Sequence, residues 1–262
     1  MNIIVCVKHV PDTTEAEFDI NEDGRTVKTE SFPFVINEWD EYAIEEAIIK
    51  KEQLGGSVIA ITVGPEDADA TLRRCLAKGA DQAIRLTDAA FEGSDAYALA
   101  KTLHSVIKDL SFDLVLTGAQ ASDDGYAQLG VMLAELLEIP HASFVKRFDV
   151  KEGGALINRE LEGGMEETLE IDLPALLTIQ TGINEPRYVS IMGIRRARDK
   201  EIKVLGLKDL GLRREEVGEA GSWLKIEEFH IPSPKKEAVI LRGGSSDTAV
   251  QLTEILRSKG LV

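Results

Sequence analysis

Apolar runs alternate with helical segments through the first half of the chain, and this order constrains the fold more than any other feature. Residues 3–7 form an unbroken apolar run rich in β-branched side chains, which is typical of a strand buried on both faces. Similar runs recur at 58–63, 83–86 and 113–117, and helical patterns lie at 37–48, 67–78, 94–108 and 123–137. Because strand–helix–strand units join parallel strands by right-handed crossovers, the sequence predicts an α/β fold with an open, mostly parallel sheet.

Two segments depart from this alternation. Residues 11–35 contain two short extended pieces around a turn at 21–24, which predicts a small hairpin inserted after the first strand. Residues 144–171 contain three short strands separated by Gly153-Gly154 and Gly163-Gly164, and an apolar strand returns at 176–179. This pattern predicts an antiparallel hairpin extension at one edge of the parallel sheet.

The C-terminal part of the sequence lacks the alternation of apolar strands and helices. The stretch 213–236 carries many charges and two prolines, Pro232 and Pro234, and predicts an extended arm. A helix is expected from about 246 to 259, with Leu252, Ile255 and Leu256 on one face. A helix this short needs a surface to dock on. We therefore expect an α/β domain over residues 1–210 and a C-terminal arm and helix over 211–262 that docks on a partner.

Composition excludes several classes. The 30 Lys and Arg against 46 Asp and Glu give a net charge of −16, which argues against nucleic acid as a partner. Cys6 and Cys75 lie in apolar segments and are expected to be buried thiols in a reducing compartment. The first apolar run is too short for a signal peptide or a membrane span. We expect a cytoplasmic protein without membrane insertion, and the four scattered histidines predict no metal site.

Common phosphate and nucleophile motifs are missing, since the sequence has no P-loop, no G-x-G-x-x-G after the first strand and no G-x-S-x-G. We therefore assign no catalytic residue. A glycine-rich loop at 243–247 precedes the last helix and could cradle a phosphate. It could equally turn the arm while Ser246 or Asp247 caps that helix.

The segment 117–128 carries the most information about a ligand, because it follows the fourth strand and opens a helix. Ligands of open parallel sheets bind beyond the carboxyl ends of strands, and free N–H groups at a helix start suit a phosphate. Gly118 would let a ligand approach the backbone closely. Asp123 and Asp124 would repel a polyphosphate, and no Lys or Arg is near in the sequence. A single phosphate held by backbone amides is the simplest interpretation. The alternative is that Ser122 or Asp123 only caps the helix.

Several motifs in order and spacing resemble the β subunit of electron-transfer flavoproteins over nearly the whole chain. They are the segments 7–12 (Val-Lys-His-Val-Pro-Asp), 37–40 (Asn-Glu-Trp-Asp), 45–47, 77–81, 117–120, 159–166 (Arg-Glu-Leu-Glu-Gly-Gly-Met-Glu), 173–175 and 184–188 (Asn-Glu-Pro-Arg-Tyr). The variant looks nearest to the β subunits that serve bacterial dehydrogenases. The resemblance implies a Rossmann-like, adenine-nucleotide-binding fold.

The resemblance also implies a function. Such a subunit pairs with a larger α subunit that holds most of the FAD, buries AMP, and accepts electrons from acyl-CoA or other dehydrogenases, with a membrane quinone oxidoreductase as a possible acceptor. Its own side chains perform no bond chemistry. Carried over by motif, the nucleotide would touch Cys6, Asn37, Glu38, Trp39, Asp40, Val63, Gly118, Ala119, Gln120, Ala121, Ser122, Asp123, Asp124, Gly125, Tyr126, Ala127, Gln128 and Leu129. Asn37 is as well placed to cap the helix that follows it.

Alternatives remain open from the sequence. Some relatives bind a second FAD in place of AMP and bifurcate electrons; Tyr126 stands where those carry a threonine, which favours AMP. A stand-alone nucleotide-binding regulatory module and an adenylating hydrolase are two further candidates. The hydrolase would need cations or a metal at 118–128, and the unpaired C-terminal helix favours an obligate partner.

A basic segment follows the last motif. Residues 187–203 contain six Lys and Arg against two acidic residues, a net charge of +4 within a protein of −16. By family resemblance, Ile191 takes the place of a leucine that anchors in a partner pocket. We expect this segment to dock electron donors through Tyr188, Ile191, Met192, Arg195 and Arg196. The alternative is a helix whose last turn is basic to suit its own dipole.

Overall fold

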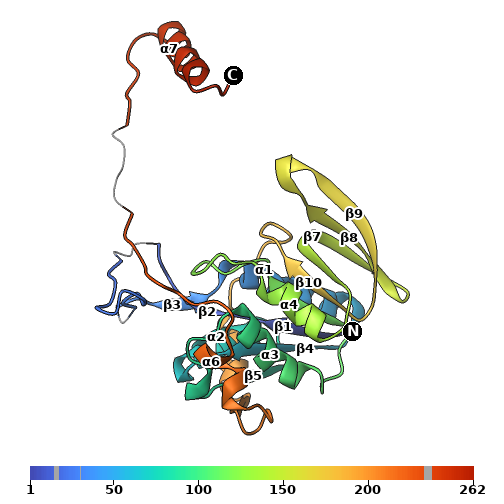
Figure 1. Cartoon of the computed structure of the whole chain (residues 1–262). Coiled ribbons are helices and arrows are strands. Elements are labelled where there is room, and N and C mark those ends of the chain that lie inside the picture. The colour runs from blue at the N-terminus through green and yellow to red at the C-terminus, as the bar shows by residue number, and fades with distance from the viewer. Residues whose placement is uncertain (15–17, 30, 233–237) are drawn as a thin grey trace. The chain divides into compact units, whose positions relative to one another are not determined.

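The computed structural model describes residues 1–14, 18–29, 31–232 and 238–262 (Figure 1). Within them, nine strands form one sheet in the order β11-β5-β4-β1-β6-β10-β7-β8-β9. The strands are β1 Asn2–Cys6, β4 Ser57–Val63, β5 Gln82–Leu86, β6 Leu114–Gly118, β7 His141–Lys151, β8 Gly154–Glu160, β9 Glu166–Asp172, β10 Ala175–Ile179 and β11 Ile202–Leu205. Neighbours pair in parallel from β11 to β7, whereas β8 and β9 are antiparallel. This confirms the predicted open sheet and its hairpin extension, drawn in yellow in Figure 1.

Helices of the first part of the chain cover both faces of the sheet. The helices of the described residues are α1 Glu38–Leu54, α2 Asp69–Lys78, α3 Ala96–Ile107, α4 Leu129–Leu136, α5 Ile191–Arg198, α6 Gly218–Gly221 and, later in the chain, α7 Ser245–Ser258. Short 3-10 turns lie at Glu66–Ala68, Ala89–Phe91, Glu162–Gly164 and Arg214–Glu216. One core joins α1, α2 and α5 to side chains such as Ile3 and Val5. The other joins α3 and α4 to Ile4 and Cys6. Successive residues of β1 therefore point into different cores, which explains its unbroken apolar run.

Several details differ from the expectations. The helix expected from 123 begins only at Leu129, so neither Ser122 nor Asp123 caps it. Strand β11 was not anticipated, because its four residues include a lysine and lie at the edge of the sheet. A small second sheet pairs β2 His9–Pro11 with β3 Phe34–Ile36. Helix α7 begins at Ser245, so Ser246 and Asp247 lie inside its first turn and do not cap it.

The chain divides into two compact units, 1–17 with 29–226 and 18–28 with 227–262. The second contains α7 and the predicted hairpin, in which Ile20 bridges Val27. Residues 15–17, 30 and 233–237, which include Pro234 and part of the expected arm, lie outside the described residues. Residues 213–226 belong to the first unit, where Trp223 stacks on Tyr97. Cys6 and Cys75 are buried free thiols, as expected. In the described part of the chain, no helix is long and apolar enough to cross a membrane.

Candidate functional site

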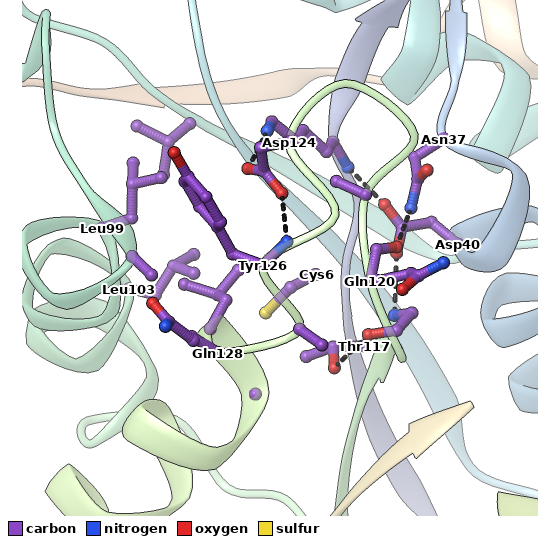
Figure 2. A pocket seen from close by; sticks show the side chains of 18 of the residues that line it. Cys6, Asn37, Asp40, Leu99, Leu103, Thr117, Gln120, Asp124, Tyr126 and Gln128 are labelled. Carbon is purple, nitrogen blue, oxygen red and sulfur yellow. Dashed lines mark hydrogen bonds and ion pairs between the residues drawn. The ribbon is translucent and has the colours of Figure 1, made fainter. Parts of the chain in front are cut away.

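A cavity of about 230 Å³ lies where β1, β4 and β6 end. Its apolar wall combines Cys6, Ile61 and Val63 from the strands with Leu99 and Leu103 from α3. Figure 2 shows Asn37 and Asp40 on one side of this cavity and Leu99 and Leu103 on the other. An apolar slot with a few polar groups at strand carboxyl ends is the usual form of a ligand site in a parallel α/β sheet.

Asp40 connects three segments at the edge of the cavity. Its Oδ2 accepts the backbone N–H of Lys8 at 2.7 Å, and its Oδ1 accepts that of Gly118 at 2.8 Å. These are the N–H groups just after β1 and at the end of β6. Burial raises the pKa of the Asp40 carboxyl to about 7, although the two backbone N–H groups act in the opposite direction. The carboxyl therefore fixes the geometry of both strand ends.

Asn37 precedes α1, but its side chain does not cap the helix. Its Nδ2 donates to the carbonyl of Gln120 at 2.8 Å, and its Oδ1 accepts the N–H of Ser122 at 3.0 Å. The expected capping role is thus wrong. Both the Nδ2 and the Oδ1 of Asn37 are hydrogen-bonded to the loop 119–128, so Asn37 shapes the cavity by holding that loop in place.

Lys8 corrects the expectation that the loop has no cation near it. Its Nζ lies 2.7 Å from Asp123 Oδ1 and 2.8 Å from Asp124 Oδ2. Burial lowers the pKa of Lys8, but its hydrogen bonds and ion pairs with the two carboxylates outweigh this and raise it above its ordinary value. The two aspartates are thereby neutralised in part, and their repulsion of a phosphate is weaker than the sequence suggested.

The start of α4 points into the cavity, which is lined by Gln128, Leu129 and Gly130. The first backbone hydrogen bond of this helix runs from Met132 N–H to the Gln128 carbonyl, so the N–H groups before Met132 have no helical partner. The buried Gln128 Oε1 also lacks a hydrogen-bond partner in the described residues. Unpaired donors and a buried unpaired acceptor together fit a polar ligand with both phosphate and hydroxyl or amino groups.

Gly118 has a role other than the expected close approach of a ligand. A Cβ at this position would lie 2.5 Å from Asp40 Oδ1 and 2.6 Å from Trp39 Cβ. The space is occupied by the first turn of α1. Gly118 therefore permits the packing of α1 against β6, and it also lines the cavity.

The structure brings most of the predicted ligand residues together. Those that line the cavity are Cys6, Asn37, Asp40, Val63, Gly118, Ala119, Gln120, Ala121, Asp124, Tyr126, Ala127, Gln128 and Leu129. The predicted residues that do not line it are Glu38, Trp39, Ser122, Asp123 and Gly125.

The sequence reasoning missed the wall made by α3. It includes Ser94, Asp95, Ala96, Leu99 and Leu103. The sequence did contain a pattern for this wall: an aspartate suited to begin a helix, followed by two leucines one turn apart. In the structure Asp95 is the N-cap, and its Oδ1 accepts the N–H of Ala98 at 2.9 Å. No group of three or more His, Cys, Asp or Glu residues suited to a metal ion occurs among the described residues.

The expected docking segment forms a separate surface around α5. Ser190 caps this helix by accepting the N–H of Gly193 at 2.9 Å. Tyr188 is 99% exposed and Ile191 80% exposed, and Met192, Arg195 and Arg196 are also exposed. Arg187, which was counted with the basic group, instead pairs with Glu45 and Glu52 at 2.9 and 2.7 Å. Fewer unpaired cations therefore lie on this surface than the net charge of residues 187–203 suggests.

The fold and the cavity define a class: an open parallel α/β protein with a ligand site at the carboxyl ends of its central strands. More specifically, the chain belongs to the electron transfer flavoprotein family, whose domain matches residues 25–210, and within it to the β subunits. It is 42% identical over 260 residues to the electron transfer flavoprotein subunit beta of Methylophilus methylotrophus, covering 98% of each chain. The subunit of that name from Thermoanaerobacterium thermosaccharolyticum is 39% identical, and the caffeyl-CoA reductase-Etf complex subunit CarD of Acetobacterium woodii 37%, each over the whole of both chains.

Proposed function

We propose that this chain is the β subunit of a heterodimeric electron-transfer flavoprotein that holds AMP in the cavity and, with an α subunit, forms the site of one FAD. Dehydrogenases such as acyl-CoA dehydrogenases deliver electrons, and a membrane quinone oxidoreductase is a candidate acceptor. FAD supplies the redox chemistry when bound. The chain's own residues bind, orient and dock, so it is an electron-carrier subunit and not an enzyme, acting in the cytoplasm.

The single observation that carries the nucleotide assignment is the polar end of the cavity. The free N–H groups at the start of α4 suit a phosphate, and Gln128 Oε1 needs a donor. The aliphatic wall of Ile61, Val63 and Leu103 suits an adenine ring. The phosphate and the adenine ring of AMP therefore each find a matching group in one cavity.

AMP is favoured over a second FAD by the rim of the cavity. Tyr126 lines the cavity and is 48% exposed, and its ring takes up space that a dinucleotide would need. A second FAD, with electron bifurcation, is the alternative.

The arm supports an obligate α subunit. None of the fourteen residues of α7 is buried, and apolar side chains such as Val250 and Leu252 are exposed, as are Val239 and Ile240 before the helix. A short helix with an uncovered apolar face is not stable by itself. We therefore assign α7 and the arm before it to contacts with the α subunit, and residues 1–210 to nucleotide binding. The first part of the expected 211–262 segment, up to residue 226, packs within the first unit instead.

Co-expression with a bacterial α subunit tests this function. We expect a yellow one-to-one complex whose flavin absorbance is bleached by an acyl-CoA dehydrogenase and its substrate, whereas the chain alone is colourless. A stable, colourless monomer or homodimer that ignores the α subunit would instead support a stand-alone regulatory module.

A further inference from the structure

The C-terminal end of α5 is capped from another helix. Arg73, on α2, donates from Nη1 to the carbonyl of Ala197 at 2.7 Å and to those of Arg198 and Lys200. The last carbonyls of a helix have no partner within it and carry its partial negative charge. A single guanidinium therefore donates to two of the last carbonyls of α5 and places a positive charge at this end of the helix.

The contact between α2 and α5 is close along its length. A Cβ at Gly193 would lie 2.3 Å from the carbonyl oxygen of Ala77, so the helices can meet only because position 193 has no side chain. Lys200 adds a hydrogen bond from Nζ to the carbonyl of Ala80 at 2.7 Å, just beyond α2. The position of α5 is thus set by backbone contacts and by Arg73.

This arrangement releases the arginines of α5 from a capping role. Arg195, Arg196 and Arg198 are exposed, and none has an ion pair in the part of the chain that the structure describes. Arg73 already donates to the carbonyls of Ala197 and Arg198 at their own helix end, whereas Arg196 donates to the carbonyl of Met192, one turn earlier, at 3.4 Å. In the described residues these arginines therefore do not cap the last carbonyls of α5, and their charges face outward.

We propose that Arg73 is a positioning residue for partner docking. It never touches the partner, but it holds α5 so that Ile191 and the free arginines are presented in one geometry. This inference rests on the proposed docking role of α5. Preorganisation of this kind lowers the entropy cost of binding, so loss of Arg73 weakens docking without removing any contact.

The test uses the assembled heterodimer and an acyl-CoA dehydrogenase selected because it reduces the wild-type complex. We expect Arg73→Ala to raise the KM for the heterodimer roughly three- to tenfold, with dithionite reduction of the flavin unchanged. Arg74→Ala is the matched control, because Arg74 makes the same charge change on α2 but lies 4.0 Å from Glu41 and not at α5. Arg73→Lys, which keeps the charge with fewer donors, should give an intermediate KM.

A double-mutant cycle with Ile191→Ala distinguishes positioning from general destabilisation. If Arg73 acts through the placement of Ile191, the two KM effects combine to less than their product. If Ile191→Ala raises the KM while Arg73→Ala behaves like Arg74→Ala, or the two effects multiply in full, the positioning role is overturned and docking at α5 stands. If Ile191→Ala changes nothing, the docking role itself is wrong and the inference falls with it.

Discussion

At the scale of single residues, buried polar side chains hold together segments that are far apart in the sequence. Asp40 joins the ends of β1 and β6 through two backbone N–H groups, and Asn37 holds the loop 119–128 through both ends of its amide. Because both side chains line one cavity, a change in either of them should alter ligand binding before it alters the core.

Asp40 leads to a prediction on pH. Its folded-state pKa of about 7 lies above the value of about 4 in an unfolded chain, so the folded state holds the proton more tightly. The contribution of this carboxyl to the free energy of unfolding is present in full below pH 4 and falls until about pH 7. The measurement is an infrared pH titration of the wild-type heterodimer, from which the spectra of the Asp40→Asn variant are subtracted. The difference should contain one carboxyl band that titrates with a midpoint near pH 7. A midpoint near 4 would contradict the assigned burial.

At the scale of elements, α1 and β6 meet through Gly118. The Cβ of Gly118→Ala would overlap Asp40 and Trp39, so we expect the heterodimer to lose roughly 1–3 kcal/mol of stability through overpacking. Gly206→Ala is the control, because its Cβ would find no atom closer than 3.4 Å. Thermal unfolding of the two variants makes the comparison. Equal stability of both, with nucleotide lost only from Gly118→Ala, would restore the ligand-approach interpretation.

Helix α5 presents an apolar residue at the edge of a cationic surface, an arrangement in which the apolar residue supplies affinity and the charges guide encounter. Ile191→Ala should remove roughly 1–3 kcal/mol of docking energy, the range for truncating a modest hot spot. Dehydrogenase-driven flavin reduction should slow, as it should for the wild type at high salt, while flavin content and assembly stay constant. Stopped-flow absorbance measures this; unchanged kinetics would remove α5 from the interface.

At the scale of the whole molecule, each of the two compact units has its own role in the proposal: the first contains the cavity and α5, and the second ends in an uncovered helix. Deletion of residues 232–262 should leave a folded α/β domain that no longer forms the heterodimer. Circular dichroism and size-exclusion chromatography with the α subunit give the two readouts. A single substitution makes the same test: Leu252→Asp should weaken assembly with the α subunit, and Gln251→Asp is the control. Assembly of the truncated chain at full affinity would show that the arm is dispensable.

The parts of the structure that could be predicted are those whose signal is local. The buried strands were readable because both faces of each strand are apolar. The start of α4 was misplaced because Asp124 caps its own turn, by accepting the N–H of Tyr126, and not the helix. Lys8 and Asp123 are 115 positions apart in the sequence, and no local sequence pattern predicts a contact between them. Strand β11 was missed because an edge strand needs no apolar run.

The identity of the bound nucleotide is the sharpest test of the proposed function. The co-expressed heterodimer is purified without added nucleotide and denatured, and the released small molecules are separated and quantified against FAD. We expect one AMP and one FAD for each heterodimer. Two FAD and no AMP would establish the bifurcating alternative, and release of FAD with no adenine mononucleotide or second FAD would contradict a nucleotide in this cavity.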